Sequence, residues 1–376
     1  MIYFDNAATG GFKPHGVMDA VFSTIKYLSA NPGRSGHKLS LSGMQTVFEA
    51  RTQFGEYFSC PSDRVIFTKN CTESLNVGIF GTLKVGGHVI STIYEHNSVL
   101  RPLFALKEKG LITLDIVFPY AQKDIVEAIR EKINSKTYMI VANSVSNVTG
   151  EELPIERIGN LAKENNLIFL VDGAQGGGHV YLNMKKQGIS MLALAGHKGL
   201  YGIMTSGVLL IEDGLSVQPL IYGGTGSESF NLNQPLCYPE RLESGTLNLP
   251  AIVSLLEGIK YVKNNLENFS IHLFNMTEKL ILSLSQIDKV KVYSKPNKSG
   301  IVSFSISNMP SAQVADILNQ KFDIAVRGGL HCAPLMHKFL NTESDGLVRA
   351  SLAVQNSSSE ISSLCQAVKK ITRLYS

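Results

Sequence analysis

Short apolar runs alternate with helical patterns through the first two-thirds of the chain, and this alternation constrains the fold most. The runs are rich in β-branched residues: RVIFT (64–68), HVISTI (88–93), YMIVANSV (138–145), LIFLVD (167–172) and GVLLI (207–211). Continuous runs of this length suit strands that are buried on both faces of a sheet. Between them, residues 123–135 and 154–166 have helical spacing. The alternation predicts an α/β domain with a mostly parallel sheet.

The pattern changes near residue 250. Residues 250–286 form a long amphipathic stretch, for which we predict two helices. Shorter strand-like and helical segments follow, ending in a helix from about Ser358, and they indicate a smaller α+β domain. We therefore predict a large α/β domain over residues 15–255, and a small domain made of residues 1–14 and 256–376.

Composition excludes several classes of protein. The net charge of +4 over 376 residues is spread without a basic block, which argues against a nucleic-acid partner. No apolar run approaches the roughly 20 residues that span a bilayer, and the start, MIYFDNAATG, does not resemble a signal peptide. The five cysteines are widely spaced, without a C-x-x-C pair. We expect no disulfide framework, no metal site and a cytoplasmic location.

Lys198 follows an apolar run, inside the glycine-rich turn of LALAGHKGLYG (192–202). A lysine in a turn is usually a solvated surface residue. In open α/β sheets, however, ligands bind beyond the carboxyl ends of the strands. A lysine held among apolar neighbours also has a lowered pKa and attacks carbonyl groups as the neutral amine. Lys198 is therefore a candidate for Schiff-base chemistry.

Asp172 ends the strand-like run 167–172. An acid at this place could cap a helix, bind a metal, or pair with a pyridinium nitrogen and keep it protonated. Gln175 lies three residues further on and could reach a ring hydroxyl. The glycines beside it do not complete a dinucleotide fingerprint, because Tyr181 stands where the last glycine is required.

A third candidate site lies at the start of the helix that follows the run 64–68. Asn70 followed by Glu73 resembles a capping box, which places the start of the helix near Cys71 and Thr72. A helix start offers free N–H groups and the positive end of the helix dipole, so it can bind phosphate. It could equally be an ordinary capped helix. His96, in YEHNS, follows the next strand-like run and could stack on a ring or be purely structural.

Ten motifs in order resemble the class V aminotransferase-fold enzymes: YFDNAATG, NPGRSGHKLS, CTESLN, EHNS, SNVTGE, VDGAQ, GHKGLYG, ESGTLN, RGGLHCAP and VRASLA. They span residues 2 to about 355. They are most similar to the cysteine desulfurase and selenocysteine lyase group, in the form whose cysteine lies on a compact loop. The resemblance implies the fold of the pyridoxal-phosphate-dependent transferases (aspartate aminotransferase-like, fold type I), which are homodimers.

The resemblance also implies how pyridoxal 5'-phosphate would be held. Lys198 would carry the cofactor covalently and move protons. Asp172 would pair with the ring nitrogen, and Gln175 with the ring oxygen. His96 would stack on the ring and take part in catalysis, and Asn147 would lie near both the ring oxygen and the substrate.

The phosphate group would lie at the helix start formed by Cys71 and Thr72. His197 would bind it as well, and Thr246 would reach it from the neighbouring subunit. Two departures from the family pattern affect this region. Ala195 stands where a serine or threonine is usual, and the loop after the lysine reads GIMTSG (202–207) instead of GPxGxG.

Two further residues would act on the substrate. Arg349 would clamp the α-carboxylate in a bidentate manner. Cys332 would accept the sulfur as a persulfide, and its setting between His331 and the glycines of RGGLHCAP suits a reactive thiolate. The remaining cysteines outside the phosphate site are expected to be small buried hydrophobes: Cys60, Cys237 and Cys365.

Three functions compete. A cysteine desulfurase would convert L-cysteine to L-alanine and pass the sulfur, by way of Cys332, to an acceptor protein. A selenocysteine lyase, or another β-lyase acting on a sulfur-containing amino acid, would use the same cofactor. A scaffold that only binds a sulfur-relay partner is disfavoured, because it would not need Lys198, Asp172 and Arg349 together.

Overall fold

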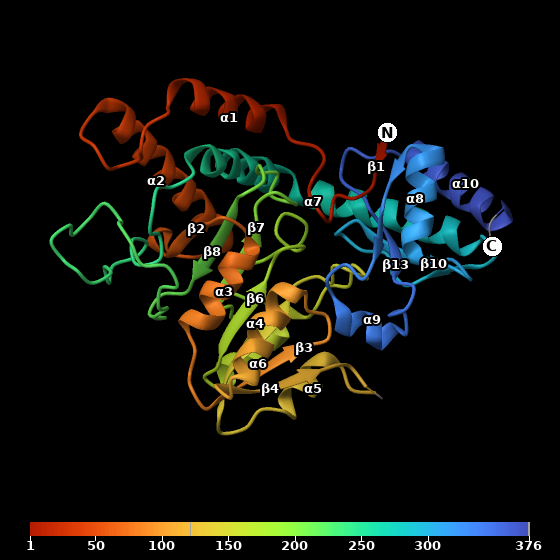
Figure 1. Cartoon of the computed structure of the whole chain (residues 1–376), viewed down its shortest axis with the longest axis horizontal. Coiled ribbons are helices and arrows are strands. Elements are labelled where there is room, and N and C mark those ends of the chain that lie inside the picture. Colours follow the sequence, from red (N-terminus) through yellow and green to blue (C-terminus); the bar gives the residue numbers. More distant parts are fainter. Residues whose placement is uncertain (121, 375–376) are drawn as a thin grey trace.

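The computed structural model describes residues 1–120 and 122–374. Its largest sheet has seven strands in the order β2-β8-β7-β6-β5-β3-β4 (Figure 1). Their bounds are β2 Val65–Thr68, β3 Gly87–Thr92, β4 Ile112–Val117, β5 Thr137–Asn143, β6 Ile168–Asp172, β7 Met191–Ala195 and β8 Gly207–Ile211. β4, β3, β5, β6 and β7 run parallel, whereas β8 is antiparallel to both β7 and β2.

The predicted α/β class is confirmed, and each apolar run quoted from this region forms a strand. The edge strand β4 was not predicted. Its burial is interrupted at Thr113, Asp115 and Ile116, and the polar residues Thr113 and Asp115 break the continuous apolar run that marks the other strands.

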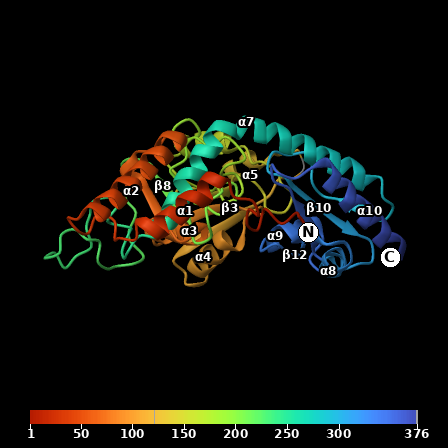
Figure 2. The same ribbon diagram turned by 90° about the horizontal axis from the view of Figure 1, so that it is seen from above.

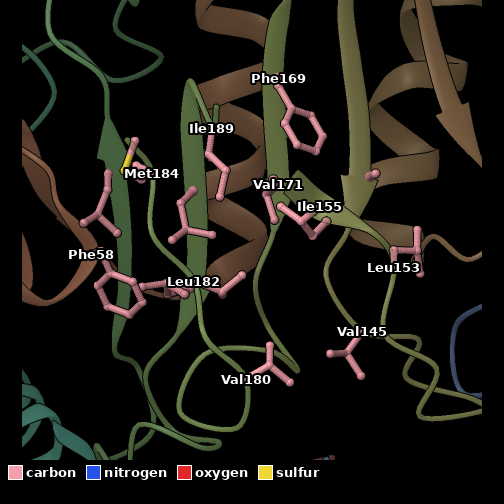
Figure 3. Close-up of a cluster of buried hydrophobic side chains, with 14 of the residues drawn as sticks. Phe58, Val145, Leu153, Ile155, Phe169, Val171, Val180, Leu182, Met184 and Ile189 are labelled. Atoms are coloured by element: carbon pink, nitrogen blue, oxygen red, sulfur yellow. The ribbon is translucent and has the colours of Figure 1, made fainter. Parts of the chain in front are cut away.

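Helices cover both faces of this sheet, as the alternation of side chains along a strand requires. One face packs on α3 (Cys71–Gly81) and α4 (Asn97–Glu108). The other packs on α2 (Lys38–Phe58), α5 (Ile125–Arg130) and α6 (Ile155–Glu164). Figure 3 shows part of this second core, where Phe169 and Val171 of β6 meet Ile155 of α6. Two further elements lie outside these layers: α1 His15–Tyr27 and the short 3-10 helix Ser62–Arg64.

A single helix, α7 (Leu249–Ser285, 37 residues), joins the two halves of the molecule (Figure 2). Its first part packs in the core of the large sheet and its second part packs in the core of the small sheet. The prediction of two helices over residues 250–286 is therefore wrong. The polar segment 263–268 in its middle contains neither proline nor glycine, and it remains helical with most of its side chains exposed.

The C-terminal part forms a four-stranded sheet in the order β12-β13-β10-β9. Its elements are β9 Val290–Val292, β10 Ile301–Ile306, α8 Ser311–Phe322, β12 Arg327–Gly329, α9 Pro334–Leu340, β13 Leu347–Ser351 and α10 Ser358–Leu374. The N-terminal strand β1 (Ile2–Tyr3) pairs with β11 (Ile324–Ala325) beside this sheet. The domain boundary near residue 255 stays a prediction, since α7 runs through it unbroken.

Among the described residues, no helix combines the length and the apolar character that crossing a membrane requires. This holds for α7 as well, although it is by far the longest.

Gly258 of α7 has no room for a side chain, because a Cβ there would lie 2.0 Å from the carbonyl oxygen of Leu200, in the turn after β7. We expect Gly258→Ala to lower the free energy of unfolding by about 1–3 kcal/mol, as other overpacked positions do. Gly16→Ala, in α1, is the control: nothing lies within 4 Å of its added methyl, so its stability should stay the same or rise slightly. Thermal unfolding of both variants tests this, and equal melting temperatures would contradict it.

Candidate active site

A cavity of about 230 Å³ lies beyond the carboxyl ends of β5, β6 and β7. This is the edge at which open α/β sheets bind ligands. Nine of the residues predicted from the sequence line it: Cys71, Thr72, His96, Asn147, Asp172, Gln175, His197, Lys198 and Arg349. Because they come from segments spread over nearly 280 positions, this convergence is a property of the fold.

Lys198 follows β7 in a turn that is fixed from the N-terminal segment. The carbonyl oxygen of His197, the residue before it, accepts hydrogen bonds from Gly10 N (3.0 Å) and Lys13 Nζ (3.1 Å). Burial lowers the pKa of Lys198, although the nearby charge of Asp172 acts in the opposite direction. The lowered pKa increases the fraction of neutral amine, the form that reacts with carbonyl groups.

Asp172 is the last residue of β6 and is buried. Its Oδ1 accepts hydrogen bonds from Ala174 N (2.9 Å) and from Cys71 Sγ (3.5 Å). In the described part of the chain, no donor reaches Oδ2. Gln175 is oriented by its own contact, in which Nε2 donates to Ala7 O at 2.9 Å. The Oδ2 atom of Asp172 is therefore left for a ligand.

The start of α3 has the geometry of an anion site. The side chain of Asn70 accepts a hydrogen bond from Glu73 N (2.9 Å), and Glu73 turns back to Lys69 N. In the predicted capping box the Glu73 carboxylate would accept from the N–H of Asn70; here it accepts from the N–H of Lys69 instead. The first N–H groups of a helix have no intrahelical partner, so those of Cys71 and Thr72 are available to an anion at the cavity.

Burial lowers the pKa of two histidines that line the cavity, His96 and His197, so both are neutral at neutral pH. His96 caps α4, with its Nδ1 accepting from Ser98 N (3.1 Å), so its proton lies on Nε2. Burial lowers the pKa of His96 to about 4. Burial likewise lowers the pKa of His197 to about 4, and its Nδ1 lies 3.1 Å from Thr9 Oγ1.

Arg349 is almost completely buried in β13, directly opposite Arg327 of β12. Its Nη1 donates to Asn147 O (2.9 Å), and its Nη2 pairs with Asp5 at 3.3 Å. Its Nε has no partner within the described chain. Burial lowers the pKa of Arg349 to about 10, so it stays charged at neutral pH. The Nε edge is free to bind a carboxylate in the fork geometry of arginine.

The loop that carries Cys332 is held against this cavity. Both His331 and Cys332 have left-handed backbone conformations (φ 49° and 57°), which are strained for residues other than glycine. Two hydrogen bonds of 2.7 Å hold the loop: Asn147 Nδ2 donates to the carbonyl of His331, and Asn97 N donates to that of Cys332. Cys332 is half-exposed, while His331 beside it lines the cavity.

Two residues discussed from the sequence, Thr246 and Cys237, lie outside this cavity. Thr246 is exposed and lines a separate depression with Thr205 and Leu220, so within one chain it does not reach the cavity. Its predicted action across a subunit interface stays a prediction. Cys237 is exposed, so the expectation that it is buried is wrong. It lies in the irregular segment between β8 and α7, where no core covers it.

Sequence reasoning missed several polar residues of this region, among them Asp5, Glu95 and Asn143. Asp5 pairs with Arg349, Asn143 lines the cavity, and Glu95 is completely buried behind it. Asn143 and Glu95 stand at or just beyond strand ends, which is the same signal that singled out Asp172.

The unpaired polar atoms of the cavity fit pyridoxal phosphate. Asp172 offers one free carboxylate oxygen, and Asn147 Oδ1 is buried without a partner. The α3 start offers N–H groups to a phosphate, and Lys198 offers an amine. An acid, an amide, an amine and an anion site are the donor set that a protonated pyridine ring with an aldehyde, a hydroxyl and a phosphate requires.

The chain is similar to proteins of one family along its whole length. The sequence profile of the aminotransferase class-V family matches residues 2–364. A probable cysteine desulfurase of Methanothermobacter thermautotrophicus is 31% identical, over 98% of this chain and 94% of that protein. A cysteine desulfurase of Serratia proteamaculans is 28% identical, over 100% and 94%.

A solved structure is also similar. The apo structure of a cysteine desulfurase from Thermococcus onnurineus NA1 superposes with a TM-score of 0.92 at 30% identity, covering 99% of this chain and 94% of that one. The match confirms the predicted fold class and family. The chain belongs to the aminotransferase class-V family.

Proposed function

We propose that this protein is a pyridoxal-phosphate-dependent cysteine desulfurase, which converts L-cysteine to L-alanine and takes the sulfur onto Cys332. The observation that carries the proposal is the position of Cys332, on a strained and tethered loop beside a cavity that also holds Lys198 and Arg349. Relatives named cysteine desulfurase over the full length of the chain support it.

Lys198 would hold the cofactor covalently, and Asp172 would keep its ring nitrogen protonated. Gln175, Asn147 and His96 would border the ring, and the start of α3 would bind the phosphate together with His197. When bound, pyridoxal phosphate withdraws electrons from the α-carbon of an attached amino acid and so makes its proton acidic.

The substrate would be oriented by its carboxylate, bound to Arg349 through Nε and the remaining N–H of Nη2. Lys198 Nζ would then take the proton from the α-carbon and return it to the product. A neutral amine is required for the first of these steps, which agrees with the lowered pKa of Lys198.

Cys332 would act as a thiolate. Its Sγ forms a bond to the sulfur of the substrate as the substrate Cβ–S bond breaks, and Cβ is then protonated to complete alanine. The half-exposed position of Cys332 leaves the resulting persulfide within reach of an acceptor protein. All five cysteines are free thiols in the structure, which supports a reducing compartment such as the cytoplasm.

The active form would be a homodimer. Large apolar side chains are exposed on three segments: Met18, Phe22 and Ile25 of α1, Met44 and Phe48 of α2, and Tyr222, Phe230 and Leu232 of the loop before α7. Met44 and Phe48 line one depression together with residues 225–227 of that loop. An apolar surface of this kind marks a protein contact. Thr246 lies at the end of the same loop, so a partner subunit covering it would bring this hydroxyl to a second site.

Cofactor attachment is tested first. The purified protein should be yellow, and borohydride should fix a pyridoxyl group on the peptide that contains Lys198. Lys198→Ala should bind the cofactor only reversibly and should not turn over. A protein that remains colourless in excess pyridoxal phosphate would refute the proposal.

The role of Cys332 is tested by Cys332→Ala, which should reduce alanine formation from cysteine at least about 100-fold, since the nucleophile is lost. The cofactor absorption spectrum should be unchanged. After brief exposure to cysteine, mass spectrometry should find an added sulfur on Cys332 of the wild type. Cys237→Ala is the matched control, because that thiol is exposed and does not line the cavity. Desulfuration by Cys332→Ala at the wild-type rate would favour a simple β-lyase.

The shared phosphate site is tested by complementation. Thr246→Asp places a negative charge against the phosphate of the partner's site and should weaken cofactor binding, whereas Thr246→Ser should not. Mixing Lys198→Ala with Thr246→Asp chains gives mixed dimers with one intact site each, so about a quarter of wild-type activity should return after random reassociation. No recovery from subunits shown to exchange would contradict the shared site.

A further inference from the structure

Glu95 is a completely buried glutamate directly before His96. Its Oε1 accepts two hydrogen bonds, from Thr92 Oγ1 at 2.6 Å and from Asn143 N at 3.0 Å. Its Oε2 is buried and has no partner in the described chain. A carboxylate with one oxygen unpaired in the interior is costly, because burial removes the water that would solvate its charge.

Asn143 carries a second unpaired atom. Its Nδ2 donates to the carbonyl of Tyr94, which fixes the orientation of the amide, because a flipped amide would set two oxygens against each other. Its Oδ1 is therefore an acceptor, and it too is buried without a partner. Asn143 is the residue whose N–H already contacts the carboxyl group of Glu95.

A proton on Glu95 Oε2 would give both unpaired atoms a partner. It converts an unpaired acceptor into a donor, and Asn143 Oδ1 is the acceptor left open on a contacting residue. The electrostatic surroundings act in the same direction. Burial raises the pKa of Glu95 to about 8, and the charge of Asp172 raises it further, against the hydrogen bonds from Thr92 and Asn143.

We propose that Glu95 is a neutral carboxylic acid in the working enzyme and acts as a positioning residue, which holds Asn143 and the turn from Tyr94 to His96 against the cavity. The inference rests on the proposed function only in that the cavity it orders is the one assigned to the cofactor. The protonation state itself does not depend on which reaction follows.

The consequence for the site is a simpler charge pattern at the ends of β3, β5 and β6. Thr92 and Asn143, from β3 and β5, are uncharged. Asp172, at the end of β6, pairs with Asn143 in the strand register. With Glu95 neutral, Asp172 is the one carboxylate at these strand ends, and His96 beside Glu95 is neutral as well. Charge at this edge is therefore concentrated on the group that would face the ring nitrogen.

The decisive measurement is infrared difference spectroscopy of the holoenzyme at neutral pH. Wild type should show the C=O stretch of a protonated acid, and Glu95→Gln should lack it. Glu131→Gln is the control, because Glu131 is exposed and its pKa is lowered by hydrogen bonding to Lys123 and Tyr120, so the band should persist. In Asn143→Leu the band should shift, since the acid loses its acceptor. Absence of a Glu95-dependent band would overturn the proposal.

Activity and cofactor absorbance distinguish a neutral acid from an anion. Glutamine donates and accepts as a protonated glutamic acid does, so Glu95→Gln should keep its spectrum and its kcat/KM within roughly threefold, whereas Glu95→Ala should lose about 10- to 100-fold. A loss above about 100-fold in Glu95→Gln, equal to that of Glu95→Ala, would assign an anionic role and refute positioning. If neither the wild type nor any variant forms alanine, the proposed function is wrong. The infrared measurement still tests the protonation state of Glu95 in that case.

Stability supplies an independent readout. The folded pKa of about 8 lies above the ordinary 4.5, so the contribution of Glu95 to stability is full below pH 4.5 and is lost as pH rises to about 8. Glutamine does not titrate. The melting temperature of Glu95→Gln relative to wild type should therefore rise across this interval, and a difference independent of pH would contradict the proposal.

Discussion

The burial of one charged side chain, Arg349, constrains the geometry on which the rest of the site depends. A guanidinium group withdrawn from water costs several kcal/mol unless its N–H groups are paired. Here the pairing comes from outside its own sheet, from the carbonyl of Asn147 and from Asp5 of the N-terminal segment. The small sheet is thereby fixed against the large one, and Asn147 in turn holds the loop of Cys332 through the carbonyl of His331.

The N-terminal segment has a comparable linking role. It begins as a strand beside the small sheet, and Ala7 N donates to Ser351 Oγ there. It then crosses to the large sheet, where the carbonyl of Ala7 accepts from Gln175 and Gly10 N donates to the carbonyl of His197. A short segment thus connects the arginine that would bind the substrate with the turn of Lys198.

Desolvation sets the charge pattern of the site. Burial lowers the pKa values of His96, His197 and Lys198 and raises that of Glu95. The groups that would exchange protons are thereby brought toward neutrality, whereas Arg349, with its much higher ordinary pKa, stays charged. An environment that brings the histidines and the lysine toward neutrality while the Arg349 guanidinium stays charged is suited to a substrate that brings its own carboxylate.

The sequence by itself determined the fold class and the chemical types at the strand ends, because continuous apolar runs and the 3.6-residue periodicity report burial locally. It also identified Lys198, Asp172 and the start of α3 as candidate site residues. The prediction of two helices in place of α7 was wrong, since a polar segment is compatible both with a break between two helices and with a solvent-exposed part of one helix. Only the tertiary structure decided that Asp5 meets Arg349 and that Glu95 meets Asn143. Such pairings, and the protonation states that follow from them, depend on packing between segments that are distant in sequence. The loss of water on burial, which shifts the pKa values, therefore cannot be derived from the local sequence.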